Sequence, residues 1–150
     1  MIMGVSAIGT PLAFIDSQIY EVHMRILIID DDPLSLSGLK MMLEQQGGHE
    51  CTSFQNPVEA VAQYQPEKYD AVITDIRMPE MSGLEVKRRI LAINPNAPVI
   101  LISGHEVQPE EQKEVGCCLC RFFSKPLRAV PLLEALQKAV ASKDNNNRTE

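Results

Sequence analysis

The chain has 150 residues, of which 45% are hydrophobic and 23% charged, and its formal net charge is −6. This length accommodates one ordinary domain, and the composition is that of a globular protein rather than a disordered or fibrous one. The negative charge argues against direct nucleic-acid binding, because such a surface needs a basic patch to neutralise phosphates.

The N-terminal segment, residues 1–23, is moderately apolar but lacks the basic start of a signal peptide and contains Asp16 and Glu21. No stretch of the sequence approaches the roughly 20 apolar residues that cross a bilayer. We therefore expect a cytoplasmic protein without membrane contact. The expected order is a poorly ordered extension at 1–23, a domain at 24–142 and a polar C-terminal tail at 143–150.

From Arg25 onward, short continuous apolar runs alternate with longer helical patterns, which is typical of repeated βαβ units and a parallel sheet. Helix start signals occur at Pro33, at Asn56–Pro57 and at Ser82. Further helices are expected behind Pro109 and over about Ala129–Ser142. The five predicted strands are Ile26–Ile29, Glu50–Phe54, Ala71–Thr74, Val99–Ile102 and Cys120–Ser124.

The five strands differ in how apolar they are, and this difference predicts their order. The first, third and fourth are unbroken aliphatic runs, whereas the second contains Thr52 and Ser53 and the fifth contains Arg121 and Ser124. A parallel sheet covered on both faces buries its central strands completely, so the aliphatic strands should be central and the mixed strands should be edges. This ranking fits an α/β fold with a doubly wound five-stranded parallel sheet in the order 2-1-3-4-5.

Polar residues follow four of these strands. Asp30, Asp31 and Asp32 follow the first strand, Asp75 the third, Ser103 the fourth and Lys125 the fifth, and the carboxyl ends of neighbouring parallel strands meet in one cleft. Converging carboxylates repel one another, so a cation is expected between them, and an oxygen-only donor set favours Mg²⁺. Lys125 adds a fixed positive charge that can pair with a carboxylate or a phosphoryl oxygen.

Each residue also has a structural explanation when taken alone. Asp32 can serve as the acidic start of the following helix, Ser103–Gly104 can be a turn, and Lys125–Pro126 can be a strand end. The convergence of four strand ends in one cleft favours a functional site over these separate explanations.

Two other groups of residues are interpreted as structural. The basic run Lys87–Arg88–Arg89 lies in a predicted helix and is expected to be a solvated helix face. The four cysteines are Cys51, Cys117, Cys118 and Cys120, and their spacing matches neither a zinc site nor a disulfide framework. They are expected to be small apolar residues near a strand.

Four segments between Arg25 and about Ser142, ILIIDDDP, VITDIRMPEMSG, VILISG and FFSKP, resemble in this order the landmarks of response-regulator receiver domains. The resemblance implies a flavodoxin-like fold and a phosphoprotein of two-component signalling or a phosphorelay. In such a protein, Asp75 accepts a phosphoryl group from a sensor histidine kinase or a phosphotransfer protein, with Mg²⁺ as cofactor. The chain would then be a phosphoacceptor signalling domain rather than an enzyme that turns over substrate.

The resemblance also implies individual roles. Asp31 would bind the metal directly and Asp30 through water, together with Asp75 and the backbone carbonyl of Arg77. The lysine of the FFSKP segment would bind a phosphoryl oxygen and precede a cis proline bond.

The same resemblance assigns a conformational switch to Ser103 and Phe122, which would change a partner surface. That surface would be formed by the fourth helix, fifth strand and fifth helix and would bind an unknown downstream protein. The stretch from Glu106 to Arg121 departs from the family pattern and lies within this surface.

Three alternatives remain open. A phosphatase resembling the haloacid-dehalogenase group would use Asp30 as nucleophile and Asp32 as general acid, but the downstream acidic pair of that group is missing and Asp75 would have no role. A degenerate receiver would act only as a docking module, although all the expected site residues are present. The chain could also be the receiver portion of a larger DNA-binding regulator.

Overall fold

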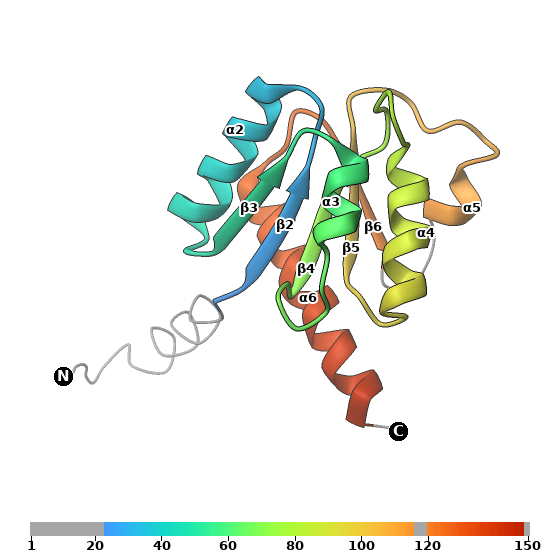
Figure 1. Ribbon diagram of the computed structural model, residues 1–150. Coiled ribbons are helices and arrows are strands. Elements are labelled where there is room, and N and C mark those ends of the chain that lie inside the picture. Colours follow the sequence, from blue (N-terminus) through green and yellow to red (C-terminus); the bar gives the residue numbers. More distant parts are fainter. Residues whose placement is uncertain (1–22, 116–119, 149–150) are drawn as a thin grey trace.

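The computed structural model describes residues 23–115 and 120–148, with a central sheet between two layers of helices (Figure 1). All pairings within the sheet are parallel, and the strand order is β3-β2-β4-β5-β6, which confirms the predicted order 2-1-3-4-5. The strands are β2 (Arg25–Ile29), β3 (Glu50–Phe54), β4 (Ala71–Asp75), β5 (Val99–Ser103) and β6 (Cys120–Ser124).

The predicted helix starts are confirmed by their capping interactions. The side chains of Asp32, Asn56 and Ser82 each accept a hydrogen bond from the first turn of the helix that follows. The helices are α2 (Pro33–Met41), which continues as the π-helical turn η1 (Met42–Gln46), α3 (Pro57–Gln63), α4 (Gly83–Ile93), α5 (Gln112–Val115) and α6 (Ala129–Arg148).

The sheet is buried on both faces, which explains the unbroken aliphatic strands. Along β2, Ile26 and Ile28 pack into the core beneath α2 and α6, whereas Leu27 and Ile29 pack into the core beneath α3 and α4. Successive side chains of a strand point to opposite faces, so each strand contributes to both cores. The two cores hold the sheet in place, and the sheet fixes the relative positions of the carboxyl ends of its strands.

The structure corrects two expectations about the helices. The last helix ends at Arg148 rather than at Ser142, because the polar sequence after Ser142 contains no glycine or proline that would stop it. Lys87 is only 5% exposed, although the basic run was expected to be solvated throughout. Its ammonium group donates a hydrogen bond to the carbonyl oxygen of Glu114, whereas Arg88 and Arg89 lie at the surface in ion pairs with Glu85.

Cys51 is a buried free cysteine, as expected of a small apolar residue beside the sheet. Burial raises the pKa of its thiol to about 12, so the reactive thiolate does not form near neutral pH. Cys117 and Cys118 lie outside the described residues, as does the predicted extension up to residue 22. Within the part of the chain that the structure describes, no helix has the length and apolar character needed to span a bilayer.

Candidate functional site

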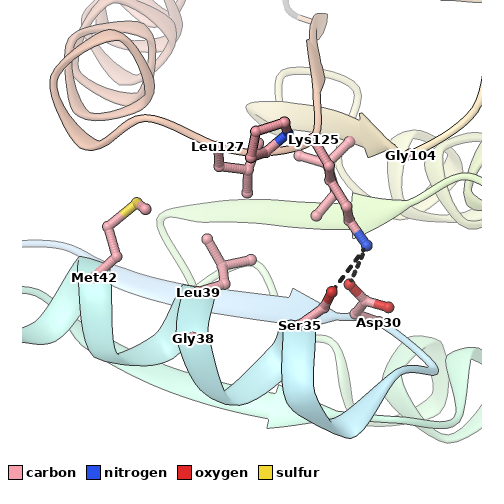
Figure 2. Close-up of a pocket in the computed structure, with 10 residues that line it drawn as sticks. Asp30, Ser35, Gly38, Leu39, Met42, Gly104, Lys125 and Leu127 are labelled. Atoms are coloured by element: carbon pink, nitrogen blue, oxygen red, sulfur yellow. Dashed lines mark hydrogen bonds and ion pairs between the residues drawn. The ribbon is translucent and has the colours of Figure 1, made fainter.

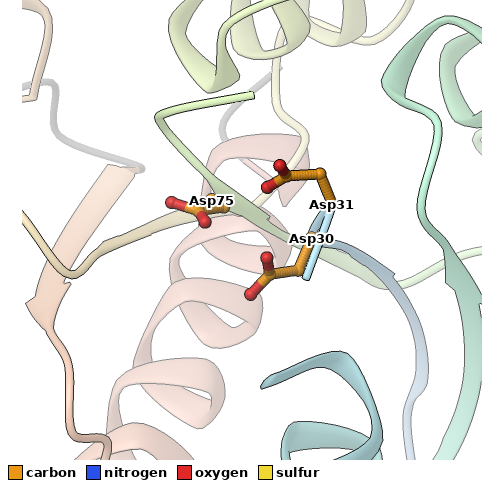
Figure 3. A group of neighbouring side chains, drawn as sticks. All are labelled: Asp30, Asp31 and Asp75. Carbon is orange, nitrogen blue, oxygen red and sulfur yellow. The ribbon is translucent and has the colours of Figure 1, made fainter. Parts of the chain in front are cut away.

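Three carboxylates meet at the carboxyl ends of β2 and β4, as the sequence predicted (Figure 3). Strand pairing places Ile29 beside Thr74. Asp30 follows Ile29 and Asp75 follows Thr74, so these two residues are neighbours. Asp30, Asp31 and Asp75 each offer an oxygen atom within 4.8 Å of the others. Asp30 is fully buried and Asp75 is 7% exposed, while Asp31 lies closer to the solvent.

Lys125 approaches this acidic cluster from the end of β6. Its Nζ lies 2.8 Å from Asp30 Oδ2 and 3.3 Å from Asp75 Oδ2. Nζ also lies 3.4 Å from the hydroxyl oxygen of Ser35, on the first turn of α2 (Figure 2). The Lys125–Pro126 peptide bond is cis, as the resemblance implied. One ammonium group therefore contacts the acidic residues of two different strands.

The charges in this cleft perturb one another. Burial and, after it, repulsion by Asp30 raise the pKa of Asp75, although Lys125 opposes both effects. Burial lowers the pKa of Lys125, but its hydrogen bond to Asp30 and the charges of both carboxylates outweigh this and raise it. Lys125 is therefore held in its charged form, but it cannot neutralise three carboxylates alone.

The acidic cluster fits a divalent metal ion of the hard type. Its donors are carboxylate oxygens, with no histidine or thiol among them, and such donors suit Mg²⁺ better than zinc or copper. A divalent cation also supplies the positive charge that Lys125 leaves unbalanced. The residues present thus fit the ion that the sequence predicted.

The main chain beneath Asp75 is held by its neighbours. The buried hydroxyl of Thr74 donates to the carbonyl oxygen of Asp75 at 2.9 Å. Gly83, the first residue of α4, lies against the same peptide group and donates from its N–H to the carbonyl of Ile76 at 2.9 Å. The start of α4 therefore positions the end of β4.

Asp32 takes no part in the acidic cluster. Its carboxylate accepts a hydrogen bond from the amide of Leu34 at 3.2 Å, as the capping residue of α2. Its own amide donates to Asp30 Oδ1 at 3.0 Å, which helps to orient that side chain. The structural explanation of Asp32 is therefore confirmed, and the phosphatase alternative, which needs Asp32 as general acid, is not favoured.

Ser103 and Phe122 occupy the neighbouring strands β5 and β6. Ser103 is buried, and its hydroxyl exchanges hydrogen bonds with the main chain of His105, donating at 3.1 Å and accepting at 3.0 Å. Phe122 is partly buried and lines a cavity of about 570 Å³ together with Val107 and Val115. Strand pairing places Asp75 beside Ile102, the residue before Ser103, and places Phe122 one strand further from the acidic cluster.

Arg77 links the cleft to the segment before α5. Its amide donates to Asp75 Oδ1 at 3.4 Å, while its guanidinium forms an ion pair with Glu111 at 2.6 Å. Sequence reasoning identified neither Glu111 nor Ser35 as part of the site. Ser35 lies in the first turn of a helix whose start was predicted, and this was its only signal in the sequence. Glu111 had no such signal.

A cavity of about 560 Å³ opens beside the cleft, between α2 and the segment after β6 (Figure 2). Asp30 and Lys125 lie at one end, and the rest of the wall is mainly apolar. The wall includes Leu39, Met42 and Leu127. The polar end and the apolar wall therefore belong to one cavity.

The family model described as "Response regulator receiver domain" matches residues 26–137. The chain is 35% identical over 120 residues to the response regulator protein TmoT of Ectopseudomonas mendocina, a match that covers 77% of this chain and 52% of TmoT. It is 34% identical over 116 residues to the chemotaxis protein CheY of Listeria monocytogenes, covering 77% of this chain and 98% of CheY.

Among solved structures, the receiver domain protein of Clostridium thermocellum superposes with a TM-score of 0.72 at 30% sequence identity. The match covers 80% of this chain and 96% of that protein. The chain spans about half the length of TmoT and a quarter of the transport regulator DctD of Rhizobium meliloti. The aligned part thus corresponds to one domain of those longer regulators.

Proposed function

Because the chain belongs to the response regulator receiver domain family of two-component signalling, we propose that Asp75 is its phosphoacceptor. The observation that carries this proposal is the position of Asp75, which lies between two acidic neighbours and a lysine 3.3 Å away. Receiver domains accept phosphoryl groups from histidine kinases. The donor of this chain is accordingly proposed to be a histidine kinase or a phosphotransfer protein.

The proposed reaction is an in-line transfer to Asp75. A carboxylate oxygen of Asp75 forms a bond to phosphorus, the bond between phosphorus and the donor atom breaks, and its electron pair leaves with the donor. Lys125 neutralises charge on the phosphoryl oxygens, and the Ser103 hydroxyl is proposed to turn from the His105 main chain toward the product. Catalysis of this kind rests on positioning and electrostatic stabilisation.

Asp31, Asp75 and the carbonyl oxygen of Arg77 are the proposed direct ligands of Mg²⁺, and Asp30 is proposed to bind it through water. When bound, Mg²⁺ would neutralise the carboxylates and coordinate phosphoryl oxygens. The proposed role of the chain is to carry the phosphoryl group and not to turn over an external substrate. The proposed output surface comprises α5, β6 and α6, with Phe122 as the switch residue, and its partner is a downstream protein.

The test is an intact-mass measurement after incubation with acetyl phosphate, with and without Mg²⁺. The wild-type protein should gain one phosphoryl group only with the metal, and Asp75→Asn should gain none. Asp32→Asn is the matched control, because asparagine also caps helices and the proposed acceptor is unaltered. Labelling of Asp75→Asn, or labelling of the wild type in excess chelator, would overturn the assignment.

The same variants separate this proposal from the phosphatase alternative. A haloacid-dehalogenase-like enzyme would lose activity in Asp32→Asn and would release phosphate from an ester continuously. The proposed phosphoacceptor would show neither behaviour, so a steady-state assay with a phosphate ester completes the test.

A further inference from the structure

The segment that contains α5 has little apolar anchorage. None of the residues from Gly104 to Val115 is buried, and α5 itself has only four residues. A helix this short has almost no intrinsic stability, so side-chain contacts with the rest of the domain must hold it. The apolar contribution is limited to the partly buried Val107 and Val115.

Ionic contacts and hydrogen bonds hold the N-terminal part of this segment, residues 106–111, against the rest of the domain. The guanidinium of Arg77 binds Glu111 through two hydrogen bonds of 2.6 and 3.1 Å and also donates to the carbonyl oxygen of Glu106 at 3.2 Å. The Glu111 carboxylate in turn accepts from the amide of Gln108 at 2.9 Å. These contacts and the charge of Arg77 lower the pKa of Glu111, so it is ionised near neutral pH.

The other end is held independently by α4. Arg88 binds the Glu114 carboxylate at 2.8 and 2.9 Å, and Lys87 donates to the carbonyl oxygen of Glu114. Their hydrogen bonds go to Glu114 and Glu85 and not to the acidic cluster. The segment therefore has one anchor that is connected to the phosphorylation cleft, Arg77, and one that is not.

Arg77 connects the two regions because it lies two residues after Asp75 and donates its amide to the Asp75 carboxylate at 3.4 Å. A phosphoryl group brings a charge of about −1.5 to −2 and three acceptor oxygens. Arginine binds such oxygens in the same two-pronged manner as a carboxylate. Phosphorylation of Asp75 therefore creates a competitor for Glu111 beside Arg77.

We propose that the Arg77–Glu111 ion pair is a clasp that holds residues 106–111 against the unphosphorylated domain and that phosphorylation of Asp75 opens it. This proposal rests on the proposed function of Asp75. When Arg77 turns toward the phosphoryl group, Glu111 loses its partner and residues 106–111 are released. The segment stays attached through Glu114, so the release is a local change at the proposed output surface.

The clasp is tested by hydrogen exchange, measured by mass spectrometry on peptides from residues 106–111, with intact mass recorded on the same samples. Phosphorylated wild type should exchange about two- to fivefold faster than the unphosphorylated protein, as expected for loss of one partly exposed ion pair. Glu111→Gln should exchange at this faster rate without phosphorylation and should change little when labelled.

Glu110→Gln is the matched control, since Glu110 is exposed and forms no ion pair with the side chains that the structure describes. It should behave like the wild type. If the wild type gains the phosphoryl mass but residues 106–111 exchange unchanged, the clasp is overturned and the assignment of Asp75 stands. If Glu111→Gln exchanges as slowly as unlabelled wild type, the clasp is likewise overturned. If no mass is gained, both proposals fail.

Discussion

The α-carbon of Gly83 lies so close to the Asp75 carbonyl group that an added Cβ would be 2.1 Å from the Asp75 oxygen. No side chain fits there without moving the backbone of either α4 or β4. This contact joins the start of α4 to the proposed phosphoacceptor, and it explains why glycine follows the capping residue Ser82.

Gly83→Ala should therefore reduce the free energy of unfolding by about 1–3 kcal/mol, the usual cost of forcing extra volume into a packed site. Gly38→Ala is the control, because Gly38 is exposed in α2 with no atom within 4 Å of an added Cβ. Its replacement should stabilise the helix by roughly 0.5–1 kcal/mol. Urea unfolding of both variants measures the two changes in free energy of unfolding. Equal effects of the two substitutions would contradict the close packing of Gly83 against Asp75.

Lys125→Met should destabilise the metal-free protein by about 3–5 kcal/mol, because it leaves the fully buried Asp30 carboxylate without its cationic partner. Added Mg²⁺ should restore part of this loss, since a metal can neutralise the same carboxylate. Thermal unfolding with and without Mg²⁺ tests both statements. Lys138→Met, an exposed substitution on α6, is the control and should change little.

Asp75→Asn should stabilise the metal-free protein near neutral pH. Burial and Asp30 raise the pKa of Asp75, so its charge costs stability. The loss of free energy of unfolding that ionised Asp75 causes is absent below the ordinary carboxyl pKa of about 3.9. It grows as pH rises toward the raised pKa of Asp75 in the folded protein and is constant above that pKa. Lys125 keeps Asp30 as its partner in the variant. Unfolding curves across this pH range should converge at the acidic end, and a less stable variant at neutral pH would refute the argument.

Protonation of His49 should destabilise the fold. Burial, and to a lesser extent the charge of His23, lowers the pKa of His49, whose Nδ1 accepts a hydrogen bond from the amide of Met24 at 3.2 Å. Well above the ordinary histidine pKa of about 6.5, His49 is neutral in both the folded and the unfolded protein, and the free energy of unfolding is not reduced. It falls as pH decreases toward and below about 6.5, because the unfolded protein binds the proton more readily. The free energy of unfolding should fall progressively between about pH 7.5 and 5. His49→Asn, which keeps an acceptor and does not titrate, should lose less over the same interval.

The fold was predictable because its signals are local. The aliphatic run before Asp30 and the run before Asp75 each identify a buried strand, and the residue that follows each run is placed at the strand end by the sheet itself. The parallel pairing then brings these residues together, so the acidic cluster follows from strand order and chain position.

The contacts around α5 were not predictable for the opposite reason. Arg77 and Glu111 belong to segments without strong hydrophobic periodicity, and their pairing depends on the path of an irregular connection. Lys87 looked like one of three solvated basic residues, but its position on α4 turns it toward the Glu114 carbonyl group. Charge alone does not distinguish a buried lysine from an exposed one, and only the placement of α5 decides it.

The clustering of Asp30, Asp31 and Asp75 links Mg²⁺ binding to phosphorylation through a thermodynamic cycle. If Mg²⁺ favours the phosphorylated state of Asp75 by some factor, then phosphorylation must tighten Mg²⁺ binding by that same factor, because the two routes around the cycle share their end points. Asp30 and Asp31 are placed at this cleft by the end of β2, which pairs with β4. If the two events are coupled in this way, the domain would bind its cation most tightly while phosphorylated, and chelation would shift the equilibrium toward the unphosphorylated protein.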